Sequence, residues 1–420
     1  MSGAPNNRSD RTLAFVIWYA ALFLLFYQFI ARSAFPTVLT EQFMKYFQID
    51  AVGMGVLASC YYWVYTFMQV PAGIIIDKVG IKALTTIAAT TCAIGVLVFI
   101  ATSNCYIAGL GQMLLGFGSS FAFLLTLKVI ATWFPSSEVP VKTAYTTAIG
   151  CSGPIIGGVM VSNLVKEFDW IVIMRVFALF GLLLAALLWM IVRERNVGQK
   201  DHGEMSIIRT LNTIVGSRQI LVLSTLSMMQ YAPLSALGDL WGVAFIKKAY
   251  GVDASTATLM NNMLYAGMVV GAPTFAYLAV FWNSYKKPMM LGVSIAAVSM
   301  SIVIFCTQLS LWSAFALFFL TGFSGGAALS FPLGIMMFPK SISATVSGFI
   351  NMATMMSGVI LMPLIGYIIN RSWSGAIIDG VRVYSTDDYR AGLMTVVIFL
   401  IIGILLSLMV EDRSTKENRS

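Results

Sequence analysis

The amino-acid sequence predicts an all-α membrane protein with twelve transmembrane helices, arranged as two pseudo-symmetric bundles of six. Three observations carry this prediction: a very apolar composition, twelve long apolar runs, and one polar stretch that divides the runs into two sets. Of the 420 residues, 58% are hydrophobic and only 10% are charged. A soluble domain has about 25% charged residues. Because so few charges cannot cover a surface that faces water, we infer that the chain is embedded in lipid.

The twelve runs are each long enough to cross a bilayer, which takes about 20 mostly apolar residues. The runs of the first half lie at 12–39, 51–76, 82–102, 106–134, 141–165 and 170–192. The runs of the second half lie at 219–246, 255–282, 288–306, 309–338, 343–369 and 391–410. The longest polar stretch separates the two sets. We therefore predict an N-terminal six-helix bundle over 1–192, a cytoplasmic linker over 193–218, and a C-terminal six-helix bundle with a short cytoplasmic tail over 219–420.

The Lys and Arg residues are distributed unequally between the two ends of the predicted helices. If the N-terminus is inside, sixteen of the 26 basic residues, among them Lys142, lie on the inner side, and seven lie on the outer side. The remaining three, Arg32, Lys128 and Arg175, lie within helices. Since loops rich in Lys and Arg stay in the cytoplasm, we expect a multi-pass protein of the cell inner (plasma) membrane with both termini cytoplasmic.

Short matches between the two halves indicate an internal duplication. Gly116-Phe117 recurs as Gly322-Phe323, Ser152-Gly153 recurs as Ser357-Gly358, and two further matches keep the same order, all at offsets of 203 to 206 residues. Parallel six-helix repeats are a known plan of membrane transporters, with the substrate site between the repeats near mid-membrane.

The side chains that most often carry catalysis are few and scattered. The five cysteines lie in or beside apolar runs without paired spacing, so we predict neither a disulfide framework nor a zinc site. The only histidine, His202, lies in the linker, and the helices contain no carboxylate pair or metal-ligand cluster. A membrane-embedded enzyme is therefore disfavoured, and we expect no catalytic residue, metal, cofactor or nucleic-acid partner. A sensor that binds a ligand without transporting it remains an alternative, because a fold does not determine a function.

The segment that closes the second predicted helix combines glycines, an acid and two cations at a defined spacing: Gly73, Asp77, Lys78, Gly80 and Lys82. It resembles the loop 2–3 signature of the major facilitator superfamily, although Ala83 replaces the last basic residue of that signature. The resemblance covers nearly the whole chain. It implies a monomeric, alternating-access secondary transporter whose cytoplasmic gate these five residues form. In that family the Asp engages basic residues and the N-terminus of helix 11, where the helix dipole favours negative charge.

Two other segments resemble signatures of the family, with departures. In the fifth helix, Gly153-Pro154-Ile-Ile-Gly157-Gly158 is similar to the core of the antiporter signature, but Gly150 stands one residue out of register. Small residues at this spacing also serve close helix packing, so both interpretations stay open. In the fourth helix, Gln112 occupies the position where the family usually carries an arginine implicated in proton coupling.

Ionisable side chains inside a membrane are costly, so each one is a functional hypothesis. Arg32 follows Trp18 by 14 residues, which places it about 21 Å further along a helix. Its register is similar to that of a substrate-binding arginine in organophosphate:phosphate antiporters, but Asp239 stands where those proteins have the partner arginine. Two roles are compatible with this pair: an outer gate, or a division in which Arg32 holds a substrate carboxylate. Snorkelling to an interface is the alternative for Arg32 and Lys128.

The cationic balance of the predicted interior favours a small anionic or zwitterionic solute, such as a carboxylate or an amino acid, over an organic cation. The candidate substrate-binding residues are charged, polar or aromatic side chains on the expected cavity helices: Arg32, Tyr27, Gln28, Tyr61, Tyr62, Tyr65, Lys128, Gln230, Tyr231, Asn261, Asn262 and Asn351. Aromatic residues at such spacing also serve packing. Asp239 is the candidate for proton coupling in a symporter. A multidrug or metabolite efflux antiporter and a uniporter or exchanger remain alternatives.

Overall fold

The computed structural model describes residues 8–135, 138–194, 207–306, 309–339, 342–373, 375, 377–378 and 381–412. Within these residues, twelve helices are long and apolar enough to cross a membrane, which confirms the predicted all-α membrane fold. Each span begins and ends within five residues of the run predicted for it. Large apolar side chains such as Trp189, Tyr277 and Phe281 lie exposed on these helices, as expected for surface that faces lipid.

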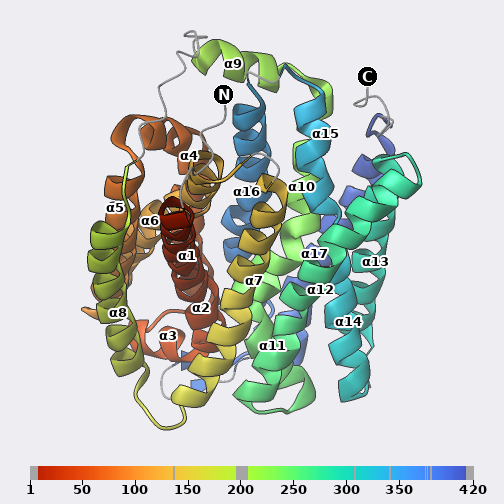
Figure 1. Cartoon of the computed structure of the whole chain (residues 1–420). Coiled ribbons are helices and arrows are strands. Elements are labelled where there is room, and N and C mark those ends of the chain that lie inside the picture. The colour runs from red at the N-terminus through yellow and green to blue at the C-terminus, as the bar shows by residue number, and fades with distance from the viewer. Residues whose placement is uncertain are drawn as a thin grey trace. The chain divides into compact units, whose positions relative to one another are not determined.

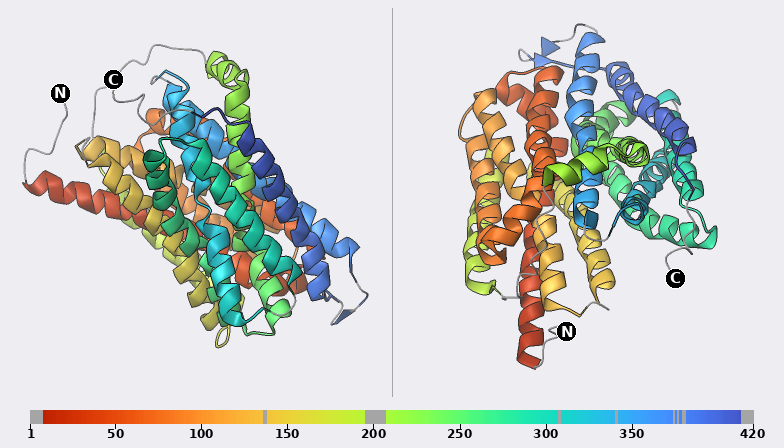
Figure 2. Two further views of the ribbon diagram at one scale, coloured as in Figure 1. Left: turned by 90° about the vertical axis from the view of Figure 1, so that its right-hand side faces the viewer. Right: turned by 90° about the horizontal axis from the view of Figure 1, so that it is seen from above.

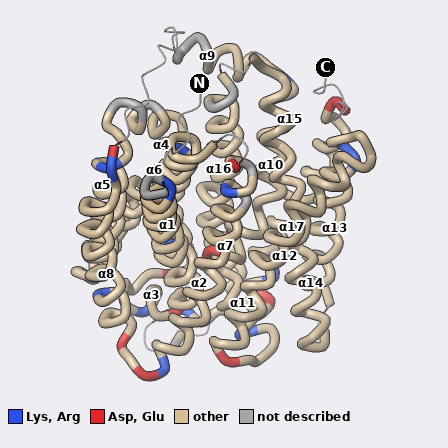
Figure 3. The backbone as a smooth tube through the Cα atoms, in the orientation of Figure 1, with Lys and Arg blue, Asp and Glu red and all other residues tan. Residues whose placement is uncertain are grey.

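The helices group into two compact units, each of which is described by itself. Unit 1 comprises Met1–Phe35 and Cys60–Lys200, and unit 2 comprises Pro36–Ser59 and Asp201–Ser420. Residues 36–59, which end the first span and begin the second, therefore pack with the C-terminal helices rather than with the rest of the N-terminal ones. In both units the charged residues gather towards the helix ends, and the segments between them are almost free of charge (Figure 3).

Unit 1 is a bundle of helices that run side by side (Figures 1 and 2). Its elements are α1 (Arg8–Phe29), the π-helix η1 (Ile30–Ala34), most of α4 (Ala51–Val79), α5 (Ile81–Ile100), α6 (Cys105–Trp133), α7 (Val139–Leu164) and α8 (Trp170–Ile191). A Cβ atom on Gly95 would lie 2.6 Å from the carbonyl oxygen of Gly111, and one on Gly111 would lie 2.6 Å from that of Gly95. Glycine at both positions is what lets the backbones of α5 and α6 approach so closely.

Unit 2 combines the C-terminal helices with two short helices from the start of the chain, α2 (Phe35–Val38) and α3 (Thr40–Phe47). Its other elements are α9 (Ile207–Val215), α10 (Arg218–Pro233), the π-helix η2 (Leu234–Trp241), α11 (Gly242–Tyr250), α12 (Ala254–Phe281), α13 (Lys286–Phe305), α14 (Leu311–Phe323), the 3-10 helix η3 (Gly326–Leu329), α15 (Ser330–Met336), α16 (Ser343–Arg371), β1 (Ile377–Ile378), β2 (Val381–Arg382) and α17 (Thr386–Leu408). Leu226, Phe275, Leu333 and Ile350 join α10, α12, α15 and α16 in one buried apolar cluster. Short α9 lies across the end of α10 (Figure 1).

The tenth span differs from the single helix predicted over 309–338. It is interrupted at Ser324 and Gly325, between α14 and the 3-10 helix η3. A Cβ atom on Gly325 would lie 2.5 Å from the backbone nitrogen of Ala272. The chain therefore turns directly against the backbone of α12, a contact that only glycine permits.

The last two spans are joined by a small antiparallel hairpin, in which Ile377 pairs with Arg382 and Ile378 with Val381. Helix α17 then begins five residues earlier than the predicted run at 391. Ser385 and Asp388 explain the earlier start because they form a capping box, in which each side chain accepts from the backbone amide of the other.

The first span of each half contains a π-helical segment, which no sequence pattern predicted. From Ile30 to Leu234, where the two segments begin, the offset is 204 residues, within the offsets of the internal repeat. A proline lies close to each segment: Pro36 is the second residue after the first segment, and Pro233 immediately precedes the second. Since proline lacks an amide hydrogen, the normal hydrogen-bond pattern cannot continue through it. Single π turns inside α-helices occur often at functional sites, and these two carry Arg32 and Asp239.

Candidate functional site

Arg32 lies inside unit 1 rather than extended towards a membrane interface. Its residue is only 4% exposed, and its guanidinium carbon lies over the rings of Phe29, at 4.8 Å, and Tyr62, at 5.6 Å. The π-helical turn positions it, because the wider helix re-aims the side chains of Ile30–Ala34, all of which are buried. The structure thus brings together Arg32 and Tyr62, two of the candidate substrate-binding residues predicted from the sequence.

Further predicted residues lie near this arginine. The Tyr61 hydroxyl donates to the Gln28 side-chain oxygen at 3.3 Å, and the rings of Tyr61 and Tyr65 stack at 5.6 Å. Tyr62 packs edge-on against Tyr61 at 5.5 Å. One wall of aromatic rings on α4 therefore faces a polar stretch of α1 and η1. We define Arg32, Gln28, Tyr61, Tyr62 and Tyr65 as the arginine cluster.

Tyr27 has a packing role. Its ring stacks on Phe177 of α8 at 4.3 Å with the planes 6° apart, and a Cβ atom on Gly181 would collide with its hydroxyl. This hydroxyl is buried and has no hydrogen-bond partner within the described residues. Neighbouring positions on a helix point to different faces, which explains why Gln28 belongs to the arginine cluster and Tyr27 contacts α8.

Lys128 lies apart from the arginine cluster, with an exposed side chain. Thr126, two positions before it on α6, has its hydroxyl 3.4 Å from the carbonyl oxygen of Ala21 on α1. Ala21 precedes Arg32 by 11 residues, which corresponds to about 16 Å along the helix. Lys128 and Arg32 therefore lie at different levels of unit 1.

The glycines of the fifth span pack against the π segment of Arg32. A Cβ atom on Gly153 would lie 2.9 Å from the Cβ of Phe29, and one on Gly157 would lie 2.7 Å from Cγ1 of Ile30. The part of α7 that resembles the antiporter signature thus provides the close approach of α7 to η1. This observation favours the packing interpretation of those glycines.

In unit 2, Asp239 is fully buried on η2 and accepts a hydrogen bond from the hydroxyl of Tyr265 on α12. Beside it, the carbonyl of Gly238 accepts from the Thr37 hydroxyl at 2.9 Å and from the Asn261 amide at 3.3 Å. Backbone carbonyls displaced from the normal helical pattern need such side-chain donors. We define Asp239, Tyr265, Asn261 and Thr37 as the aspartate cluster.

The sequence predicts Asn261 as a site residue but not Tyr265. The two residues are four positions apart on α12, so they share one helix face, and this spacing could have identified Tyr265. Asn262, the next residue after Asn261, is also buried. Asn261 keeps one buried side-chain oxygen without a hydrogen-bond partner in the described part of the chain.

The remaining candidate substrate-binding residues of the second half lie outside the aspartate cluster. The Gln230 amide donates to the Met289 carbonyl at 3.0 Å, which ties α10 to α13. Tyr231 is buried and Asn351 is half-buried. Gln230 precedes Asp239 by nine residues, or about 13 Å along the helix, so it does not belong to the aspartate cluster.

The predicted gate segment is partly described. The side chains of Asp77 and Lys78 lie outside the described residues. Gly80 has a φ of 92°, and the Lys82 amide donates to the Glu194 carboxylate at 2.7 Å. The Lys82 ammonium lies 4.4 Å from the ring centre of Trp189. Glu194, a residue of the predicted linker, therefore caps the N-terminus of α5, where an anion is favoured by the helix dipole.

Residues 36–59 are attached to the C-terminal helices of unit 2 by a set of polar contacts that we name the latch. Glu41 forms an ion pair with Lys247, and Asp50 lies 3.9 Å from Arg382 of the hairpin. The Ala51 amide donates to the Tyr384 hydroxyl at 3.0 Å. Burial raises the pKa of Tyr384, so this hydroxyl keeps its proton and donates to Asn370 at 2.9 Å.

These features define a class of protein: a polytopic membrane transporter built from two related halves, with a buried ionisable side chain on a π-helical segment of the first helix of each half. The chain belongs to the Major Facilitator Superfamily, whose family model matches residues 21–243 and 240–420. It is a secondary transporter of that superfamily, as the fold and the sequence signature predicted.

Individual relatives are distant. The chain is 21% identical to the uncharacterized transporter YybO of Bacillus subtilis, over 77% of this chain and 80% of that protein. It is 22% identical to the probable galactarate/D-glucarate transporter GudP of Escherichia coli, over 90% of this chain and 92% of that protein. The probable galactarate/D-glucarate transporter GarP of Escherichia coli is 24% identical, over 42% of this chain and 40% of its own length.

Two solved structures share the fold. The bacterial homolog of the human lysosomal transporter Spinster, in an inward-facing and unoccupied conformation, superposes with a TM-score of 0.78 at 13% identity, covering 96% of this chain and 98% of that one. A mutant form of the nucleoside transporter NupG has a TM-score of 0.76 at 13% identity, and the match covers 94% of this chain and 99% of that one. At this identity the likeness concerns the fold.

Proposed function

We propose that this transporter moves a small organic acid across the membrane by alternating access, with Arg32 as the group that binds the substrate carboxylate. The observation that carries the proposal is the burial of Arg32 against two aromatic rings in the arginine cluster. A guanidinium in such surroundings is expensive to bury. A carboxylate matches it, because the two planar groups can form two parallel, charge-assisted hydrogen bonds.

The substrate class follows from the rest of the cluster and from the relatives. Gln28 and Tyr61 lie on neighbouring helices and offer hydrogen-bond donors and acceptors suited to hydroxyl groups. Relatives that match part or most of the chain are named as probable galactarate/D-glucarate transporters. These compounds are hydroxylated dicarboxylic acids and are anions at neutral pH. A hydroxylated carboxylate therefore satisfies both the charge and the hydrogen-bonding groups of the cluster.

The coupling ion that we propose is the proton, with Asp239 as the group that binds it. Among the described residues, the buried charged side chains are Arg32, Lys142, Asp239 and Asp388. Asp388 caps α17 and Lys142 is held by Glu138 and aromatic rings. Asp239 is thus the buried acid that has no capping role. We further propose a monomer in the inner membrane with both termini cytoplasmic, in agreement with the distribution of Lys and Arg.

The proposal is tested by ligand-induced stabilisation of the purified protein, followed by uptake into sealed proteoliposomes. D-glucarate, galactarate and gluconate should raise the melting temperature, since a ligand at 100 times its Kd stabilises the native state by about 2.7 kcal/mol. Neutral galactitol of similar size should not. Stabilisation by hydrophobic cations and not by acids would favour an efflux antiporter, and binding without uptake would favour a sensor.

A further inference from the structure

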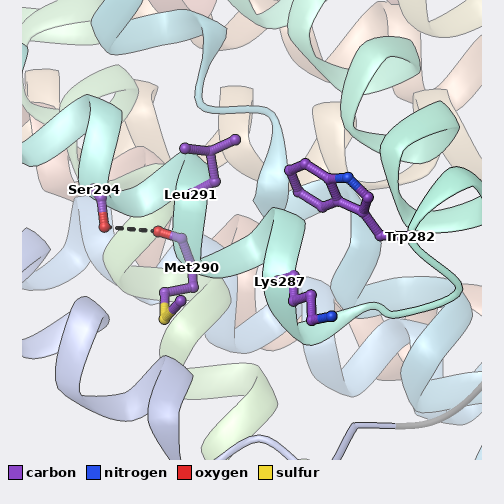
Figure 4. A pocket seen from close by; sticks show the side chains of 5 residues that line it. All are labelled: Trp282, Lys287, Met290, Leu291 and Ser294. Atoms are coloured by element: carbon purple, nitrogen blue, oxygen red, sulfur yellow. Dashed lines mark hydrogen bonds between the residues drawn. The ribbon is translucent and has the colours of Figure 1, made fainter.

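A groove opens on one face of α13, close to its junction with α12, and is not part of either charged cluster (Figure 4). Its volume is about 390 Å³, and Trp282, Lys287, Met290, Leu291 and Ser294 line it. The last four of these residues follow the spacing i, i+3, i+4 and i+7, so they form one stripe along the helix. Trp282 joins them from the end of α12.

The groove presents one cation. Lys287 is exposed and forms no ion pair within the part of the chain that the structure describes. Its neighbour Lys286 has a structural role, because its ammonium donates to the Leu408 carbonyl at the end of α17, at 2.6 Å. The carboxylate of Asp412 is likewise engaged, as it accepts from the Ser284 hydroxyl at 2.8 Å. Of the two adjacent lysines, Lys287 is therefore the one presented to a ligand.

Below this cation the groove becomes apolar. Helix α13 is a membrane span that starts at Lys286, so Lys287 stands in its first turn and Ser294 lies about 10 Å deeper. Met290 and Leu291 occupy the intervening turn, and the Ser294 hydroxyl is satisfied by the Met290 carbonyl at 2.8 Å. Trp282, which is 36% exposed at the end of α12 that leads into α13, is of the type that prefers the membrane interface.

We propose that this groove binds one anionic phospholipid, with the phosphate at Lys287 and the indole N–H of Trp282 and an acyl chain along Met290 and Leu291. The cation lies at the helix end and the apolar residues lie deeper in the span, in the same order as the headgroup and the acyl chain of a lipid. Exposed side chains near the groove, such as Phe281 at the end of α12, are apolar. If the termini are cytoplasmic, as proposed above, this helix end faces the inner leaflet, where anionic lipids attract basic residues.

The experiment compares lipid retention by native mass spectrometry of the full-length protein in detergent. Palmitoyl-oleoyl phosphatidylglycerol, the corresponding phosphatidylcholine and inorganic phosphate serve as probes. The wild type should retain phosphatidylglycerol in preference to phosphatidylcholine. Lys287→Ala should weaken that binding about fivefold, which corresponds to the ~1 kcal/mol contributed by one basic residue near an anionic lipid surface. Trp282→Leu should weaken it as well, since it removes the indole N–H and leaves an apolar side chain in place.

The matched control is Lys248→Ala. Lys248 is also an exposed lysine of unit 2, but it lies at the end of α11, beside the start of α12 and away from Trp282. This control should retain phosphatidylglycerol like the wild type. Equal retention of the two lipids, or an equal loss in Lys248→Ala and Lys287→Ala, would overturn the proposal. Competition by millimolar inorganic phosphate would assign the groove to a free anion instead. Should Lys287→Ala fail to fold, Lys287→Gln makes the same test.

Discussion

The Tyr265 hydroxyl donates a hydrogen bond to the Asp239 carboxylate, and both residues are buried in unit 2. This bond joins α12 to a π-helical segment of the seventh span. An ionised carboxylate only accepts hydrogen bonds, whereas a protonated one also has a proton to donate. A protonated Asp239 would therefore have a proton to donate to a further acceptor, and the carboxyl can accept from the Tyr265 hydroxyl in either state.

Asp239→Asn should abolish concentrative uptake and preserve exchange of substrate across the membrane, because the amide keeps a hydrogen-bonding group but cannot take up a proton. Tyr265→Phe should keep concentrative uptake and lower its rate about tenfold, the effect of one lost hydrogen bond to a charged group. Both are measured in proteoliposomes with an imposed pH gradient. If Asp239→Asn concentrates substrate with a normal pH dependence, the proton binds elsewhere. A wild type that never concentrates substrate would identify a uniporter or exchanger.

Arg32→Ala should weaken substrate binding about 30-fold or more (~2 kcal/mol), because the substrate carboxylate loses its buried partner. Arg32→Lys should restore only part of the affinity, since a point charge replaces a bidentate fork. Affinity is read from the dependence of the melting temperature on ligand concentration. Arg175→Ala, which removes an exposed arginine of α8, is the control and should bind like the wild type. An unchanged affinity in Arg32→Ala would exclude Arg32 from the site.

Asp77→Asn should sharply reduce transport and leave thermal stability near that of the wild type, because we propose, from the resemblance to the family signature, that Asp77 belongs to the cytoplasmic gate. Glu194→Ala should show the opposite pattern. Loss of the cap on α5 should lower the free energy of unfolding by about 1 kcal/mol. Uptake and melting temperature are measured on the same preparations. Full transport in Asp77→Asn would remove the proposed gate role.

One contact of the latch, the ion pair between Glu41 and Lys247, should break during each transport cycle. We expect that Glu41→Cys combined with Lys247→Cys, linked by a short cleavable thiol reagent, stops uptake, and that cleavage of the link restores it. The chain also contains five native cysteines, so the pair is placed in a background where these are replaced by alanine or serine. Unlinked protein and each single variant serve as controls. Normal uptake by fully linked protein would show that this contact is static.

Lys142 should contribute to stability through a cage of aromatic rings. Its ammonium lies 4.2 Å, 4.4 Å and 4.0 Å from the ring centres of Phe15, Trp18 and Phe134, and 3.5 Å from Glu138. Lys142→Met should lower the free energy of unfolding by about 1–2 kcal/mol, since it keeps most of the apolar stem and loses the cation–π contacts. Lys142→Ala should cost more. Lys248→Ala is the exposed control, and equal melting temperatures of all three variants would show that the cage stabilises nothing.

The sequence by itself determined the number of spans, their approximate ends and the family. These conclusions depend on the bilayer, which requires about 20 apolar residues for each helix, and on a signature of consecutive residues around Asp77. The apolar runs and the signature are each formed by residues close together in the chain, so they can be recognised without knowing how the helices pack. The sequence also predicted the offset of the internal repeat, and the starts of the two π-helical segments are separated by an offset in the same range.

Only the tertiary structure decided which side chains meet. Lys142, counted among the loop cations, is buried in α7, and Gln230, predicted to bind the substrate, donates to the Met289 carbonyl of α13. Composition cannot reveal this, because the direction of a side chain depends on how its helix is rotated and which helix packs against it. The π-helical turns add to the difficulty, since each one changes the rotation of all later residues in its span. The hydrogen bond between Tyr265 and Asp239 is one result of that rotation.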